Sequence, residues 1–381
     1  MLRCNILSVF LTFSLLAGAQ DWKVVRENPQ KAFPKTVAAG NYSGIAHLHD
    51  DIYAVVSDKS DSALYFNFRI LVNPKTGELE QVENLGFTER TDGTLNDGKF
   101  WQGQEKGFDH EAIVKASDST LVIASEGCCR LKEYPILPTS ADAAKVGSSQ
   151  NLWESRWPSS EFYPNYNFES LAFDSVRQYL WTIPESTLRK DGQPATPQNG
   201  LANQLRLMRL DWGKMKENRN KEEYSEQVSS KKDSRYMTPY AYQMDQPSTH
   251  KKADIYVMGV SELCALPDGQ LLVLEREAFI PKIKIGAFCK CKLYQINPLN
   301  SEEFSMKENF SSDTPFLKKR LLAEWKTGLS LSKRSFANYE GMCLGPKLED
   351  GSQVVILLSD SQDQYAGVLK DWFKTIVIRK E

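Results

Sequence analysis

The sequence predicts an all-β chain that folds as a β-propeller of four-stranded blades, and two observations support this. A pattern of one apolar strand, a tight turn and a second strand ending in an acidic residue occurs five times along the chain. The copies recur at intervals of roughly 60 to 90 residues, which suits four-stranded units whose outer loops differ in length. Counting the copies gives five blades, and a ring with a sixth, degenerate blade is the alternative.

Each copy is expected to begin with a β-hairpin, because a strand of apolar and small residues leads through a turn into a β-branched strand. The hairpins run over 42–58, 110–126, 168–185, 261–275 and 339–360. Third strands are expected at Ala63–Val72, Arg130–Ile136, Gln204–Asp211, Lys290–Asn297 and Trp372–Arg379. Fourth strands are expected at Glu78–Asn84, Trp153–Trp157, Tyr240–Met244 and Lys319–Trp325.

The ring is expected to close through the N-terminal segment Trp22–Glu27. The fifth unit ends after its third strand, so this segment can supply the missing outer strand and remove the open sheet edges. The stretch around 212–237 is dominated by charge and lacks apolar periodicity, which predicts a solvated loop insertion in the third unit. Residues 20–381 are expected to form one domain.

Residues 1–19 have the features of a secretory signal peptide. Met1-Leu2-Arg3 is basic, Ile6–Leu16 is apolar, and Ala17 and Ala19 place small residues before the expected cleavage site. The apolar run is too short to span a membrane. We therefore expect an exported protein, periplasmic or extracellular, with no membrane span.

The overall charge excludes some classes of partner. The formal net charge is −2, so no basic field favours nucleic acid or anionic lipid. We expect a monomer that binds a small molecule, which the resemblance described below extends to phosphorylated compounds.

The hairpins are expected to gather their acidic residues at one mouth of the central channel. A hairpin places the start of its first strand beside the end of its second, and first strands are innermost in a propeller. The first-strand positions are Glu111, Glu169, Glu262 and Glu340, with Ser43 in the first unit. The second-strand positions are Asp58, Glu126, Glu185, Glu275 and Asp360.

Carboxylates this close raise one another's pKa values or need compensation. Three solutions are open: a bound hard cation, interleaved basic side chains such as Arg276, or hydrogen bonds to backbone amides at blade junctions. Calcium is the expected cation, because it prefers oxygen ligands and suits an exported protein. Its expected ligands are Glu111, Glu169, Glu262 and Glu340. Ser43 either opens one side of the mouth or reflects divergence of the repeat.

The motifs and their order resemble a known family. The residues concerned are Ser43-Gly44 with Ser57-Asp58, Glu111-Ala112 with Ser125-Glu126, Phe168–Ala172, Leu271–Arg276, and Tyr339–Gly341 with Leu358–Asp360. From about Gly40 to Lys380 the chain is similar to the family called esterase-like activity of phytase. The resemblance implies a propeller, usually exported, that hydrolyses phosphoesters or carboxylic esters. Calcium-dependent propeller phytases also use clustered Lys and Arg for phosphate, and this sequence has no dense basic cluster.

Three functions remain open at this point. The first is a metal-assisted ester hydrolase, in which Asp58 or Asp360 is the general base and Arg276 stabilises the developing anion. The second is a propeller that binds a ligand at the same mouth without turnover, and the third is a purely structural interaction protein. Fold alone does not choose among them.

Overall fold

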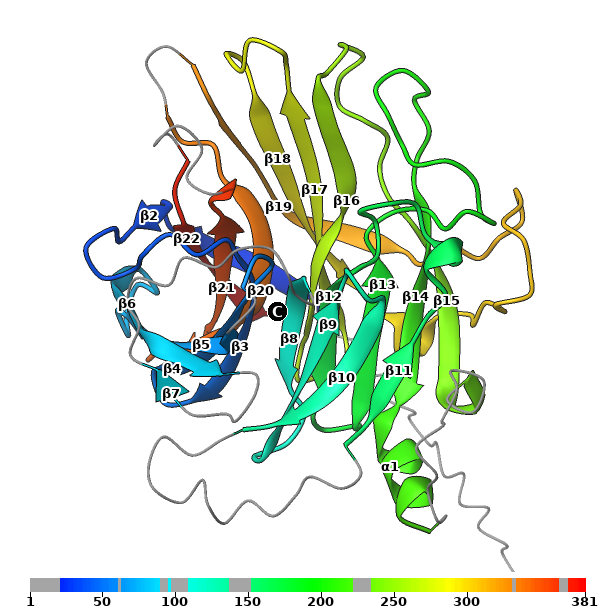
Figure 1. Cartoon of the computed structure of the whole chain (residues 1–381), viewed down its shortest axis with the longest axis horizontal. Helices are drawn as coiled ribbons and strands as arrows, with labels where there is room; N and C mark the ends of the chain where they lie inside the picture. Colours follow the sequence, from blue (N-terminus) through cyan, green and yellow to red (C-terminus); the bar gives the residue numbers. More distant parts are fainter. Residues whose placement is uncertain are drawn as a thin grey trace, which may run out of the picture.

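A computed structural model of the chain describes residues 21–60, 63–89, 95–96, 109–136, 152–221, 234–330, 334–362 and 369–381. The expected signal peptide lies outside the described residues. The structure contains five antiparallel sheets arranged as the blades of a propeller (Figure 1). The fold class and the count of five blades are confirmed, and the six-bladed alternative is wrong.

The first four blades follow one another along the chain. The first blade consists of β3 (Tyr42–His49), β4 (Ile52–Ser57), β5 (Ala63–Val72) and β6 (Leu79–Glu89), with the short β7 (Leu95–Asn96) at its edge. The second consists of β8 (His110–Lys115), β9 (Thr120–Ser125), β10 (Arg130–Pro135) and β11 (Glu154–Arg156). The third consists of β12 (Phe168–Asp174), β13 (Tyr179–Pro184), β14 (Gln204–Asp211) and β15 (Met237–Gln243). The fourth consists of β16 (Ile255–Ala265), β17 (Leu271–Ile280), β18 (Phe288–Ile296) and β19 (Lys319–Gly328).

The fifth blade joins the two ends of the chain. It consists of β20 (Asn338–Lys347), β21 (Gln353–Asp360), β22 (Trp372–Lys380) and, as outermost strand, β1 (Trp22–Glu27); β2 (Lys31–Ala32) also pairs with β22. Trp22 opposes Lys380 and Glu27 opposes Ile376 in this antiparallel ladder. The expected closure of the ring by the N-terminal strand is therefore present.

Five apolar cores lie between neighbouring blades and hold the ring together. Each core combines side chains from two adjacent blades, as in the core where Ile45 and Phe68 of the first blade meet Val354 and Phe373 of the fifth. The strands alternate so that both faces of each sheet contribute to such a core. Burying these faces supplies the hydrophobic stabilisation that fixes the positions of the innermost strands.

The charged stretch between β14 and β15 of the third blade differs from the expectation. Residues Trp212–Lys221 form helix α1 rather than a loop, and 222–233 lie outside the described residues. Trp212 and Met215, one helical turn apart, are both buried. The Trp212 ring packs edge-on against Trp153 of the neighbouring blade, and Lys216 forms an ion pair with buried Glu133. Two apolar residues are too few to give a periodic signal, so charge dominated the sequence pattern.

No helix in the described ranges is long and apolar enough to cross a membrane.

Candidate functional site

A β-bulge at the start of each innermost strand determines which side chains enter the channel mouth. The register shifts within 42–45 of β3, 110–112 of β8, 168–170 of β12, 260–262 of β16 and 339–341 of β20. A bulge inserts an extra residue whose side chain is re-aimed relative to the ladder. The extra residues are Ser43, Glu111, Glu169, Ser261 and Glu340.

The fourth blade corrects the sequence interpretation by one residue. Val260 pairs with Glu275 in the way that Phe168 pairs with Pro184, the residue before Glu185. The fourth-blade counterpart of Glu185 is therefore Arg276, and the counterpart of Glu169 is Ser261. Four second strands end in an acid at this position, and the fourth blade supplies a cation instead.

The mouth opens into a cavity of about 720 Å³. Ligand pockets commonly have volumes of about 300–1,000 Å³. Among the residues that the structure describes, its polar lining is strongly acidic, with three basic side chains, Lys59, Arg276 and Lys284. The seven carboxylic residues are Asp58, Asp109, Glu111, Glu126, Glu169, Glu185 and Glu340.

Arg276 neutralises one side of this cavity. Its Nη2 donates to Glu185 Oε1 at 2.6 Å and to Glu169 Oε2 at 3.1 Å. Its Nη1 donates to Glu340 and, at 3.1 Å, to the side-chain oxygen of Asn338. The guanidinium is almost fully buried, and such charge-assisted bonds are strong in a buried site.

The close approach of Glu185 to Arg276 depends on a glycine. Gly259 pairs with Arg276 in the ladder, and a Cβ there would lie 2.3 Å from Glu185 Cγ. Any side chain at this position would displace Glu185. The fourth blade thus supplies both Arg276 and, through Gly259, the room that Glu185 needs to approach it.

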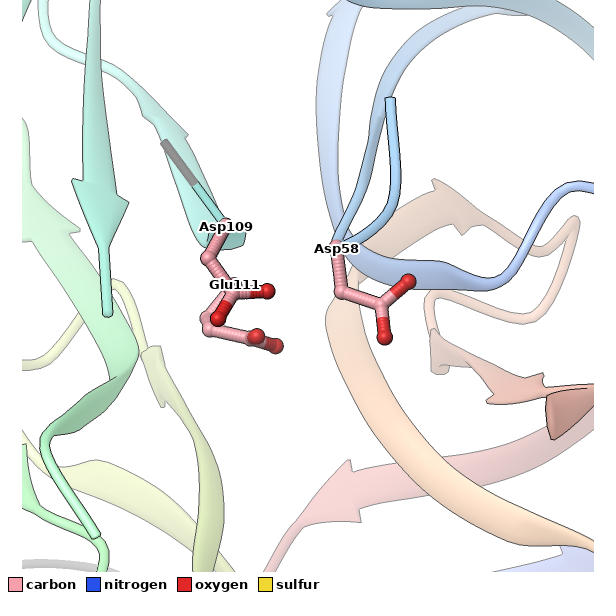
Figure 2. A group of neighbouring side chains, drawn as sticks. All are labelled: Asp58, Asp109 and Glu111. Atoms are coloured by element: carbon pink, nitrogen blue, oxygen red, sulfur yellow. The ribbon is translucent and has the colours of Figure 1, made fainter. Parts of the chain in front are cut away.

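Three acids that are not bound to Arg276 form a cluster in the cavity lining. Asp58 follows β4 of the first blade, whereas Asp109 and Glu111 stand at the start of β8 in the second. Each offers a carboxylate oxygen, and these oxygens lie within 4.8 Å of one another. Figure 2 shows the side chains of Asp109 and Glu111 facing that of Asp58 across the blade boundary.

Asp109 was missed from the sequence, although a signal was present. Its counterparts two residues before the bulge are Asn41, Asn167, Gly259 and Asn338. Asp109 has a φ of 55°, a left-handed conformation that Asn, Asp and Gly tolerate best. Among its counterparts only Asn41 shares the positive φ. The backbone carbonyl of Asp109 accepts the Glu126 amide at 2.8 Å, as the Asn167 carbonyl accepts the Glu185 amide, so the repeated position has a backbone role. Only the second unit places a carboxylate there.

Glu111 is the least compensated acid of the cluster. Its exposed fraction is 8%, and in the part of the chain that the structure describes it has no hydrogen bond or ion pair. Burial, together with the carboxylates of Glu169 and Asp58, raises the pKa of Glu111 well above its usual range. A buried carboxylate in this position needs either a proton or a cation.

Glu126 stands beside the same cluster. Burial and the carboxylate of Glu185 raise its pKa to about 7, although the Asn167 amide opposes this. The Asn167 amide donates to Glu126 Oε1 at 3.2 Å. A carboxyl group with such a pKa exchanges protons near neutral pH.

Two of the expected mouth residues lie elsewhere. Glu262 Oε1 accepts the amides of Leu171 and Leu263, both at 2.9 Å, and its carboxyl group is also bonded to the amide of Met342. It therefore ties the third, fourth and fifth blades together below the cavity. Glu275 points to the junction of the third and fourth blades, where it accepts from Tyr242 and Lys319, both at 2.7 Å. The expected placement of Glu262 and Glu275 at the mouth is wrong, because the bulge shifts the register by one residue.

Asp360 and Ser43 are close to the mouth but are engaged by the protein. Asp360 is buried and accepts from the backbone and side-chain amides of Gln362. The Ser43 hydroxyl donates to the His110 carbonyl at 2.6 Å, which links the first two blades. Ser43 therefore does not open one side of the ring.

The family comparison confirms the resemblance expected from the sequence motifs. The family described as "Esterase-like activity of phytase" matches residues 37–362, nearly the whole chain. The chain belongs to this phytase-like family. Among curated proteins, no sequence matches it.

Several solved structures are similar to the phytase-like chain in fold. A streptogramin B lyase is 9% identical with a TM-score of 0.32, over 93% of this chain and 98% of its own. A member of the DUF4221 family from Bacteroides vulgatus is 8% identical with a TM-score of 0.34, over 96% and 100%. The WD40 domain of a Toxoplasma gondii coronin is 9% identical with a TM-score of 0.33, over 96% and 89%. Similarity at this level says nothing about what the phytase-like chain binds.

Proposed function

We propose that this phytase-like propeller is an exported, cation-dependent ester hydrolase. The observation that carries the proposal is Glu111, a buried carboxylate without a hydrogen bond or ion pair in the described part of the chain. It lies beside Asp109 and faces Asp58 across a blade boundary. A protein gains nothing in stability from such a charge. The arrangement is typical of a site that receives a cation.

The donor set fits calcium. Asp58, Asp109 and Glu111 all offer carboxylate oxygens, which hard divalent cations prefer. Of the four ligands expected from the sequence, Glu169 and Glu340 are bound to Arg276 and Glu262 to backbone amides, so only Glu111 remains in the proposed set. When bound, the cation supplies Lewis-acid polarisation of an ester oxygen.

The cavity lining favours water as the nucleophile. Along the described ranges it contains no Ser, His or Cys side chain. In carboxylic ester hydrolysis, the water oxygen forms a bond to the carbonyl carbon, the bond from that carbon to the alkoxy oxygen breaks, and the proton of the water passes to the alkoxide. Glu126 lines the cavity on the same blade as Asp109 and Glu111, so it is placed to accept that proton first and then to donate it.

The remaining acids and Arg276 have a positioning role in this proposal. Arg276 is occupied by Glu169, Glu185 and Glu340, so it keeps that side of the cavity rigid and less negative. It has little capacity left for a substrate anion. An uncharged carboxylic ester therefore suits the cavity better than a phosphate monoester.

The alternative is a propeller that binds a ligand at this mouth without turnover. The saturation of Arg276 favours it, because the described part of the cavity lining contains no other buried cationic side chain that could stabilise a developing anion. A ligand retained unchanged over long incubation would support this alternative.

Hydrolysis assays with purified protein test the proposal. We expect hydrolysis of a simple aryl carboxylic ester with calcium and its loss with a chelator. Asp109→Asn and Glu111→Gln should each lower kcat/KM by at least about 100-fold. Asp313→Asn, an exposed change outside the ring centre, is the matched control and should leave the rate unaltered. Absence of turnover with carboxylic and phosphate esters alike, with and without calcium, would overturn the proposal.

A further inference from the structure

The cavity has a second, apolar half that the ester chemistry does not use. Besides the acids, its lining includes Ile255, Val257, Ala278 and Ile280 on one wall. Ala287, Leu329, Phe336 and Leu369 complete the apolar lining.

This wall exists because the fourth blade has an unusually long inner hairpin. β16 has 11 residues and β17 has 10, whereas β8 and β9 have six each. The added residues precede the bulge in β16 and follow Arg276 in β17, so they rise above the channel mouth. In Figure 1 the upper ends of β16, β17 and β18 stand clear of β8 to β13.

Cross-strand pairs carry the apolar surface from the rim to the acidic floor. Ile255 pairs with Ile280 and Val257 with Ala278, and the next pair on the same face is Gly259 with Arg276. Alternation sends the intervening residues to the other face, where Tyr256 donates to Glu277 Oε1 at 2.9 Å. One continuous surface thus runs from apolar side chains to the charged centre.

The core covers only part of this wall: Ala278 is buried and Ile280 packs against the core between the fourth and fifth blades. Ile255 is 49% exposed although it lines the cavity. An apolar surface that ends at a charged centre is typical of a pocket for a ligand with both characters. The acidic floor disfavours an anionic head group, since its described residues include seven carboxylic side chains and three basic ones.

We propose that the substrate is an uncharged carboxylic ester with an apolar chain, which lies along the wall from Ile255 and Ile280 to Ala278 while the ester group meets the acidic floor. This inference rests on the proposed hydrolase function and specifies its substrate class. Each methylene that the wall covers contributes to binding through the hydrophobic effect.

A chain-length series tests the inference. With 4-nitrophenyl acetate, butyrate, octanoate and dodecanoate below their micellar concentrations, we expect kcat/KM to rise about 3- to 4-fold per covered methylene. Ile255→Asn combined with Ile280→Asn should flatten this rise, because the altered wall no longer gains apolar contact with each added methylene. Ile283→Asn, on the exposed turn after β17 and outside the cavity lining, is the matched control. Hydrolysis of all four esters at equal kcat/KM by the wild type would overturn the inference and leave the hydrolase proposal intact.

A binding measurement separates the two proposals. Calorimetry with an uncharged dodecyl glycerol ether, which cannot be hydrolysed as an ester, should show binding to the wild type and to Ile283→Asn. The bulky Ala278→Trp variant should bind at least about 10-fold more weakly, because the indole would occupy the space along the wall where the chain of the ligand lies. Binding by the wild type supports the inference even if no ester is hydrolysed. Equal binding by wild type and Ala278→Trp would contradict it.

Discussion

Two buried glutamates near the ring centre have different roles: Glu111 stands at the bulge of β8 in the second blade, and Glu262 one residue past the equivalent position of β16 in the fourth. Glu262 accepts two backbone amides at 2.9 Å, whereas Glu111 has no hydrogen bond in the described part of the chain. Hydrogen bonding to backbone amides is the ordinary reason for a buried carboxyl group. Glu111 lacks it, which is why we assign Glu111 to a ligand site and Glu262 to the frame.

Truncating both glutamates tests this difference. Glu262→Ala leaves the amides of Leu171 and Leu263 without an acceptor and should lower the free energy of unfolding by about 2–3 kcal/mol. Glu111→Ala removes an uncompensated acid and should leave that free energy unchanged or raise it by about 1 kcal/mol when calcium is chelated. Urea unfolding of both variants in chelator measures the effects. Equal losses for the two would contradict the assignment.

Gly259 is the second residue whose role is specific. Gly259→Ala should displace Glu185 from Arg276 and lower the free energy of unfolding by about 1–3 kcal/mol. Gly213→Ala in helix α1 is the matched control, since its new Cβ meets only the Gln178 side chain at 3.2 Å and Ala favours a helix. Thermal or urea unfolding compares the two, and a neutral Gly259→Ala would contradict the close packing inferred here.

At the scale of strands and blades, the junction between the third and fourth blades is held by charge. Asp245 follows β15 and contacts Lys319 on β19 at 2.8 Å, Tyr294 on β18 at 2.6 Å and Lys292. Burial pushes the pKa of Asp245 up, but the hydrogen bonds from Lys292, Lys319 and Tyr294 outweigh it and hold the pKa well below the usual value. The ionised form therefore stabilises the fold.

This junction predicts an acid-dependent loss of stability. Because the pKa of Asp245 is lower in the folded than in the unfolded chain, its contribution is present above the unfolded value and is lost as pH falls toward the folded value. The difference in unfolding free energy between wild type and Asp245→Asn should shrink from about pH 6 to about pH 3. Urea midpoints across this range measure it, and a difference that stays constant or grows would contradict the prediction.

The strand scale also explains how far the sequence could predict the site. The strands Ala63–Val72, Gln204–Asp211 and Trp22–Glu27 have the expected bounds, because apolar alternation and turn residues define them locally. The sequence pattern aligned the fourth hairpin with the others one residue out of register. Glu262 and Glu275 were matched to the acids of the other blades by residue type, whereas their neighbours Ser261 and Arg276 occupy the equivalent positions. Only the pairing of Val260 with Glu275 across a bulge distinguishes the two alignments, and a bulge depends on the partner strand.

The apolar wall and helix α1 could not be predicted from the sequence, because both depend on tertiary structure. Ile255 and Val257 have the pattern of an ordinary strand, and their function depends on the height of β16 above its neighbours. Helix α1 is stabilised by tertiary packing, in which Trp212 contacts Trp153 and Met215 joins the same core, and its sequence has no apolar periodicity that would predict it.

At the scale of the whole molecule, the ring depends on β1. Trp22 is buried between the fourth and fifth blades, and its Nε1 donates to Asp268 Oδ2 at 2.8 Å. Closure removes the exposed edge of β22 that would otherwise be free to pair with another chain. The acidic residues converge only while the ring is closed.

Weakening this closure should destabilise the entire propeller. Trp22→Ala should lower the free energy of unfolding by about 3–5 kcal/mol. Val25→Ala on the same strand, where the side chain is 40% exposed, is the matched control and should cost less than about 1 kcal/mol. Unfolding monitored by circular dichroism compares them, and similar small effects would show that β1 is dispensable for closure.

Calorimetric titration of the full chain with calcium is the most direct test of the account, because the proposed chemistry depends on a cation between the first two blades. We predict one site for the wild type, retained in Glu169→Gln and abolished in Glu111→Gln and Asp109→Asn. A wild-type chain that binds no calcium, or binding that survives both Glu111→Gln and Asp109→Asn, would contradict it.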